Sequence, residues 1–184
     1  MTRYEIDQNH TDLGFTAKHM IFTTVRGHFA QYAGYLETED DDYSKASGEF
    51  TVQVASIDSS NEKRDEHLRS ADFFDAAKHP TITFRPTAIA AKGGDRYAVT
   101  GDLTIREVTR PIELNVKVEG KIAKDAFGKE RIAVSATGTV NRKDWGLNWN
   151  MALETGGWLV SEEIKIEVEA AFVADAKVAA ATAA

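Results

Sequence analysis

The 184-residue chain contains no cysteine, which excludes disulfide bonds and metal sites built from thiolates. Basic residues are outnumbered by acidic ones. There are 22 lysines and arginines against 29 aspartates and glutamates, for a net charge of −7, and no basic stripe offsets this balance. Because nucleic-acid binding needs clustered positive charge, no nucleic-acid partner is expected.

No apolar run approaches the roughly 18 residues of a membrane span, so stable membrane insertion is not expected. The first residues, MTRYEIDQNH, lack the charged and apolar regions of a secretory signal, and a cytoplasmic location is the expectation. The sequence has no nucleophile elbow, phosphate-binding glycine loop or dinucleotide fingerprint, and its five histidines form no His-x-x-x-His pair. Neither catalysis, a cofactor nor a metal ion is therefore expected.

Alternation of apolar and polar residues dominates most of the chain, as is typical of strands with one dry and one wet face. It is clear in DLGFTAKH (12–19), GEFTVQVAS (48–56), PTITFRPTAIA (80–90), RYAVTGDLTIR (96–106), PIELNVKVEG (111–120), RIAVSATGTV (131–140) and EIKIEVEAAF (163–172), and weaker in VRGHFAQYAGYLE (25–37). Gly93-Gly94 predicts a tight hairpin turn. About eight strands with short connections predict an all-β fold, a single antiparallel β-barrel over residues 1–174.

Two segments break this pattern. RDEHLRSADFFDAAKHP (64–80) is crowded with charges. Ser59 and Glu62 fit a capping box that starts a helix, and Ser70 can cap a second turn carrying Phe73 and Phe74. We expect a short helical insert, about residues 60–78, that plugs one end of the barrel; a movable lid is the alternative. Residues 175–184 have no core pattern and are predicted to be a disordered tail, with a short alanine-driven helix as the alternative.

The dry faces carry many small residues, which we place at Ala17, Ala33, Ala88, Gly101, Ala136 and Gly138. A barrel of about eight strands is just wide enough to be filled by its own side chains or to hold one small ligand. The residues alone leave both interpretations open. Trp145, Trp149 and Trp158 share one loop-like stretch, where they form either a portal to a cavity or ordinary core that closes that end.

Six motifs occur in a fixed order along the chain. They are Asp7-x-x-His10 with Phe15 and His19, Gly27-x-Phe29, RDEHLRSADFFD (64–75) with Pro80 and Phe84, GDLTI with VTRP (101–111), Arg142-x-Asp144-x-Gly146, and VSEEIKIEVE (160–169). Together they resemble the YceI-like family, polyisoprenoid-binding proteins with a lipocalin-like barrel, over roughly residues 4–173. The resemblance implies a barrel that holds the apolar tail of an isoprenoid or similar amphiphile, and a homodimer. Glu107 stands where glycine is common in the family, which predicts ordinary backbone angles at that turn.

The sequence therefore predicts a non-catalytic protein that binds a long-chain isoprenoid, quinone or prenol-like, or another amphiphilic lipid, for storage or transport. The expected tail contacts inside the barrel are Leu13, Phe15, Phe29, Val52, Phe84, Val99, Leu103, Leu114, Val116, Val134, Ile164 and Ile166, and those at the barrel ends are Phe73, Phe74, Trp145 and Trp149. One alternative is an enzyme acting on a lipid-like substrate, for which Asp65, His67 or Asp144 would be the residues to test. The other is a filled barrel that acts through its outer surface in a stress response.

Overall fold

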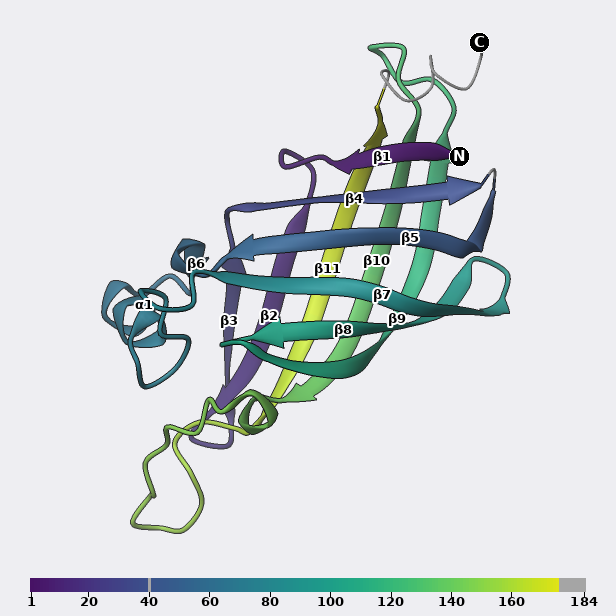
Figure 1. Ribbon diagram of the computed structural model, residues 1–184. Helices are drawn as coiled ribbons and strands as arrows, with labels where there is room; N and C mark the ends of the chain where they lie inside the picture. The colour runs from purple at the N-terminus through teal and green to yellow at the C-terminus, as the bar shows by residue number, and fades with distance from the viewer. Residues whose placement is uncertain (40, 176–184) are drawn as a thin grey trace.

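The segments of alternating polarity form long β-strands in the computed structural model, which describes residues 1–39 and 41–175 (Figure 1). The elements are β1 (Thr2–Ile6), β2 (Asp12–His19), β3 (Thr23–Phe29), β4 (Tyr32–Glu39), β5 (Asp42–Gln53), η1 (Val54–Ser56), β6 (Ile57–Asp58), α1 (Glu62–Arg69), β7 (Thr81–Gly93), β8 (Arg96–Ile105), β9 (Val108–Ile122), β10 (Arg131–Asn141), η2 (Arg142–Trp145) and β11 (Glu163–Ala174). Apart from Asp175, the predicted tail lies outside the described residues.

Eight strands close into an antiparallel barrel in the order β1-β4-β5-β7-β8-β9-β10-β11, because β1 pairs with both β4 and β11. Strands β2, β3 and β6 extend the sheet from the N-terminal half of β11. The predicted all-β barrel is thus confirmed. The tight hairpin is also present: Gly93 pairs with Arg96, which leaves Gly94 and Asp95 as the turn.

The strand count inside the N-terminal third differs from the prediction. Residues 25–37 do not form one strand, because Ala30 and Gln31 separate β3 from β4. The sequence also missed β1, whose Tyr4 is only 1% exposed. A five-residue strand with a single fully buried position gives too little alternation to be recognised from the sequence.

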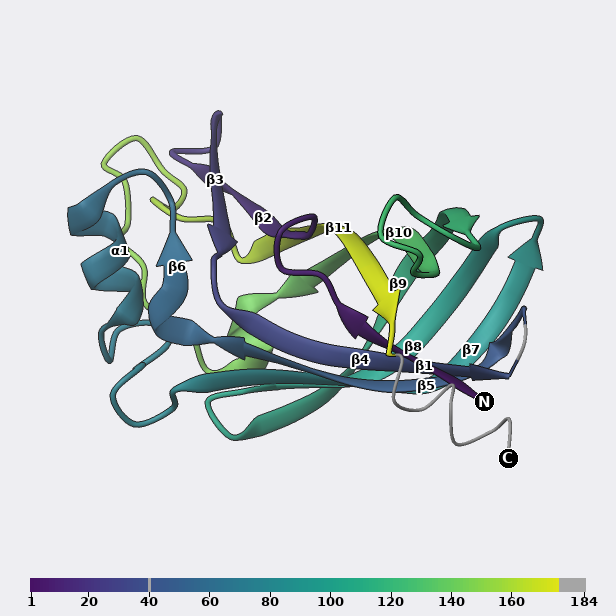
Figure 2. The same cartoon turned by 90° about the horizontal axis from the view of Figure 1, so that it is seen from above.

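A different apolar cluster lies towards each end of the barrel. Tyr4, Ile132, Ala170 and Phe172 form the cluster near the N-terminus. Burial raises the pKa of Tyr4, whose hydroxyl donates a hydrogen bond to Glu130. At the opposite end lie α1, the turns that follow it and the loop between η2 and β11, as Figures 1 and 2 show from two directions.

The helical insert is the plug that the sequence predicted. Phe73 is 5% exposed within the apolar cluster at this end, and Leu68 and Phe74 pack against that cluster. The predicted cap was wrong, however: Asn61, not Ser59, caps α1 and accepts a hydrogen bond from the Arg64 amide. Ser59 points into the fold.

The turn between β8 and β9 also departs from the expectation. Ile105 pairs with Val108, so Arg106 and Glu107 are the two residues of the turn, and both have left-handed backbone angles, with φ of 51° and 64°. Positive φ at both central residues is the type I′ geometry, which matches the twist of the flanking strands. The prediction of ordinary angles at Glu107 is therefore wrong, because the hairpin geometry overrides the local preference of the residue.

Candidate functional site: the barrel cavity

A cavity of about 640 Å³ runs through the barrel between the two apolar clusters. Most of its lining is hydrocarbon, contributed by aliphatic and aromatic side chains. The alternative of a barrel filled by its own side chains does not hold, since this volume remains open.

All sixteen residues that the sequence assigned to a ligand site line this cavity. From the strands these are Leu13, Phe15, Phe29, Val52, Phe84, Val99, Leu103, Leu114, Val116, Val134, Ile164 and Ile166, and from the ends Phe73, Phe74, Trp145 and Trp149. They come together because alternate residues of every strand face the barrel axis. Sequence reasoning missed Ile6 and Leu36, which belong to strands β1 and β4 that it had not resolved, and it left Phe50 out of the site although its alternation had been recognised.

The cavity owes its width to phenylalanine rings that lie against glycines of neighbouring strands. A Cβ atom built on Gly27 would stand 2.4 Å from Cζ of Phe15, and one on Gly101 would stand 2.4 Å from Cζ of Phe84. Gly34 meets Phe50 in the same way, at 2.3 Å from Cδ1. Because glycine has no side chain, each ring lies flat on the barrel wall, and the centre stays open.

Two of the small residues assigned to the dry face are exposed, namely Ala33 and Ala88, and of these two Ala88 does not line the cavity. In β7 the reason is a bulge between Pro86 and Ala88, where the pairing with β8 slips by one residue. A one-residue slip moves the following side chains to the other face, so Ile89 rather than Ala88 lines the cavity. The sequence signal for this bulge was the proline within the strand.

Buried Arg142, 5% exposed, organises the loop at the plugged end. Its Nη1 donates to the carbonyl oxygens of Leu147 (2.6 Å) and Trp149 (2.8 Å), and its Nε donates to that of Ser161 (2.9 Å). Burial lowers the pKa of Arg142 from its ordinary value. The side chain also lines the cavity.

The three tryptophans occupy three different environments. Trp145 is 2% exposed and donates from Nε1 to the Leu103 carbonyl at 3.0 Å, so it is core. Trp149 packs edge-on against His67, with ring centroids 4.5 Å apart, beside Phe73. Trp158 is 54% exposed. Neither the portal nor the core interpretation therefore covers all three rings.

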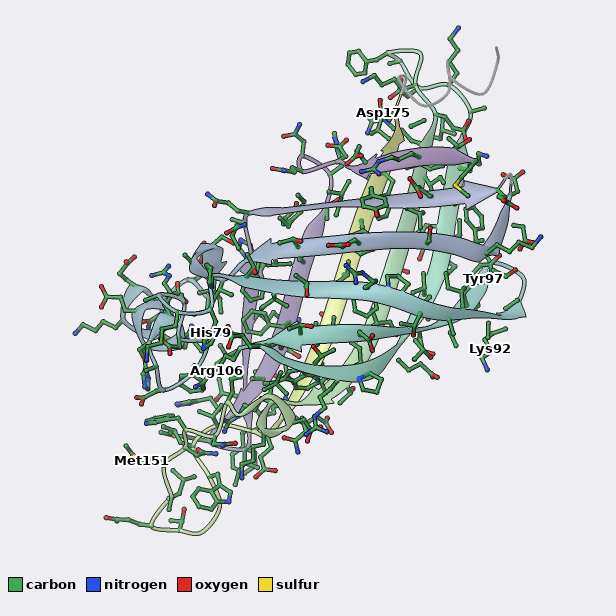
Figure 3. The ribbon with its side chains drawn as sticks, in the orientation of Figure 1. His79, Lys92, Tyr97, Arg106, Met151 and Asp175 are labelled. Carbon is green, nitrogen blue, oxygen red and sulfur yellow. The ribbon has the colours of Figure 1, made fainter. Side chains whose placement is uncertain are left out.

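Arg106 links the insert to this loop by hydrogen bonds. Arg106 donates from Nη1 to the carbonyl oxygens of Phe73, at 3.0 Å, and Gly146, at 3.2 Å. In Figure 3, Arg106 and His79 lie beside the helical insert, and Met151 marks the outer part of the loop. These bonds hold plug and loop together as one end wall.

The cavity reaches solvent between α1 and the turn that joins β2 to β3. Lys18 and Lys63 both line the cavity and are exposed, which places its mouth between them. The exposed apolar side chains of Met20, Ile21 and Phe22 lie beside the loop here, with the Met20 amide donating to the Leu159 carbonyl at 2.8 Å. Met151 and Trp158 of that loop are exposed as well.

The residues named for the enzyme alternative do not form one site. The Asp65 carboxylate accepts from the amide and hydroxyl of Ser59, at 2.9 and 2.5 Å, which fastens α1 to the strand before it. His67 contacts Asp72 at 2.8 Å, and Asp144 is exposed. Within residues 1–39 and 41–175, no cluster of three or more histidine or acidic side chains is placed to hold a metal ion. No helix in this part of the chain is long and apolar enough to cross a bilayer.

A family model, curated sequences and solved structures each match most of this chain. The model of the YceI-like domain matches residues 4–172. A UPF0312 protein of Staphylococcus aureus is 36% identical over 172 residues, covering 94% of this chain and 98% of the relative. Among solved structures, Burkholderia cenocepacia BcnA superposes with a TM-score of 0.78 at 23% identity, covering 90% of this chain and 98% of BcnA. A polyisoprenoid binding domain from Saccharophagus degradans gives a TM-score of 0.68 at 16% identity, covering 94% and 98%. At these identities the two structures show the shared fold.

Proposed function

This chain belongs to the YceI-like family, and from that premise we propose that it binds the hydrocarbon tail of an isoprenoid or another long-chain amphiphile inside its barrel, for storage or transport. The single observation that carries the proposal is the open apolar cavity of about 640 Å³ along the barrel axis. The likeness to a structure described as a polyisoprenoid binding domain supports an isoprenoid tail.

The size of the cavity sets the length of tail that fits. At roughly 30 Å³ for a water-sized group, the cavity has room for roughly 20 carbon atoms, or four isoprene units. Burial of each methylene contributes about 0.8 kcal/mol, so one isoprene unit contributes up to ~4 kcal/mol before the cost of ordering the tail. Affinity should therefore rise steeply with tail length and level off once the cavity is full.

The chemistry of the lining favours a binding protein over an enzyme. In the described part of the chain, no aspartate or glutamate lines the cavity. A bound hydrocarbon would meet aliphatic and aromatic side chains along nearly its whole length, and such contacts hold a tail without activating any of its bonds.

Isothermal titration of the purified, delipidated protein with prenols of 10, 15, 20 and 25 carbons tests this proposal. We expect at least a tenfold gain in affinity at each step up to 20 carbons, and less than a threefold gain from 20 to 25. Equal affinity along the series would contradict it.

A matched pair of variants on β10 locates the tail. Val134→Trp places an indole in the cavity, whereas Thr137→Trp places the same group on the exposed outer face. The first should weaken binding of the 20-carbon prenol at least tenfold and the second should leave it unchanged. If both variants bind like the parent protein, the tail does not lie in the barrel.

A further inference from the structure

Among the described residues no aspartate or glutamate lines the cavity, whereas six basic side chains do, in a chain whose net charge is −7. They are Lys18, His19, Lys63, Arg64, His67 and Arg142. They come from the end of β2, from α1 and from the start of η2, the elements that surround the mouth and the plugged end. Because acidic residues outnumber basic ones in the whole chain, this one-sided set of bases is unlike the average surface of the protein.

Arg142 has a donor group without a partner. Its Nε and Nη1 are used by the loop carbonyls, but within the described residues its buried Nη2 makes no hydrogen bond. Glu162 is the carboxylate whose charge acts on Arg142, and it is bound to Lys143 at 2.7 Å. A buried guanidinium with an unsatisfied donor is costly unless an acceptor completes it.

The bases on α1 and β2 are engaged to different degrees. Arg64 donates to Ser59, from Nε to the hydroxyl at 2.7 Å and from Nη2 to the carbonyl at 2.6 Å, but it forms no ion pair among the described residues. His67 contacts Asp72, and Lys18 donates to the Thr24 hydroxyl at 2.6 Å. Lys63 has neither a hydrogen bond nor an ion pair within residues 1–39 and 41–175.

We propose that the amphiphile held in this cavity carries an anionic head group, a carboxylate or a phosphate, and that this head lies at the α1 end among Lys63, Arg64 and Arg142. The inference rests on the proposed function, because the tail supplies most of the binding energy. It also gives the ligand a direction. An apolar cavity alone lets a tail enter either way round, whereas a basic rim at one end places the head group at the mouth. An anion there accepts hydrogen bonds from donors that have no other partner, such as Nη2 of Arg142, and no carboxylate in the lining repels it.

Ligands with identical tails and different heads test this inference. Farnesyl phosphate is compared with farnesol, and palmitate with hexadecanol, by isothermal titration at low and high salt. For the parent protein we expect the anion to bind about tenfold more tightly than the alcohol, the worth of one hydrogen bond to a charged group. The preference should shrink at 1 M salt, because the mouth is open to solvent and its charges are screened.

Lys63→Gln is the test variant, because Lys63 holds no other group in place. It should reduce the preference for the anion two- to fivefold, the range for a solvent-exposed ion pair, and leave farnesol binding unchanged. Lys92→Gln is the control. Lys92 is an exposed lysine near the β7–β8 turn, at the opposite side of the barrel from the insert in Figure 3, and its loss should change neither affinity.

The outcomes separate this inference from the proposed function. If alcohols and anions bind equally, the basic rim is not a head-group site although the cavity still takes tails; if no long-tailed ligand binds, both ideas fail. If Lys63→Gln weakens alcohol and anion alike, it acts on the tail, and the inference is overturned. Inorganic phosphate alone is a further arm: competition by millimolar phosphate as strong as that by farnesyl phosphate would show a free-anion site and overturn it too.

Discussion

Gly27→Ala should narrow the cavity without touching its mouth or its charges. A methyl group at Gly27 would stand 2.4 Å from Cζ of Phe15 and 2.9 to 3.0 Å from two further atoms of the same ring. Its three nearest neighbours therefore all belong to Phe15. Ordinary contact begins near 3.4 Å, so the ring must move by at least the difference, 1 Å, away from the wall. The room on the other side of the ring is the cavity.

The expected loss of affinity follows from the volume that the ring takes. A phenyl ring displaced by this distance removes the space of about one to two methylenes of tail. At about 0.8 kcal/mol for each, a tail that fills the cavity should bind roughly four- to fifteenfold more weakly. A ten-carbon prenol occupies about half the space and can avoid the displaced ring, so its affinity should change less than twofold.

Titration of 10- and 20-carbon prenols into Gly27→Ala measures both effects. Gly120→Ala is the matched control, since a Cβ atom at Gly120 meets nothing within 4 Å. Equal losses for the two prenols would mean that the substitution disturbs the fold or the mouth, and no loss for the 20-carbon prenol would mean that Phe15 does not limit the cavity. Either result would refute the reasoning from the ring position.

Three further substitutions probe stability. Glu107→Gly should raise the free energy of unfolding in urea by about 0.5–1 kcal/mol, because it removes a left-handed non-glycine residue from the turn. Arg131, 2.5 Å from Asp7, lowers the pKa of that carboxyl to about 2, so the pair contributes stability above about pH 4 that is lost as the pH falls towards 2; Arg131→Gln should raise this pKa in an NMR titration and reduce the acid-induced loss. Asp65→Ala should cost about 1–3 kcal/mol in thermal or urea unfolding, because two buried donors of Ser59 lose their acceptor; an unchanged midpoint would show that water replaces it.

The inward-facing residues could be predicted from the sequence because strand geometry has a period of two. Leu13 and Phe15, or Ile164 and Ile166, need only this rule and a correct strand assignment to be placed in the cavity. The rule failed where the period breaks. After the bulge before Ala88, the residues expected to face the cavity face solvent and those expected outside face the cavity. The alternation itself does not mark the residue at which such a slip occurs.

Other features depend on side-chain contacts that form only in the folded chain. Ser59 fits the capping box because Glu62 follows it by three residues, yet its amide and hydroxyl donate to the Asp65 carboxylate, and it is Asn61 whose side chain accepts the capping hydrogen bond from the Arg64 amide. The three carbonyl partners of Arg142 come from a loop that returns to it only in the folded barrel. Sequence reasoning placed Arg142 in a motif but had no means of seeing its free donor.

The glycines show why an open cavity, rather than a filled core, forms in this barrel. Small inward residues alone would let larger neighbours relax into the vacant space, as packed cores do. Here the space at Gly27, Gly34 and Gly101 is instead occupied by Phe15, Phe50 and Phe84, whose rings press against the wall. Each large side chain is thereby drawn outward from the axis rather than towards it, so glycine and phenylalanine together hold the interior open. A barrel with alanine at these three positions would keep the same alternation and charge, yet the rings would turn inward and the room for a tail would be reduced from three sides.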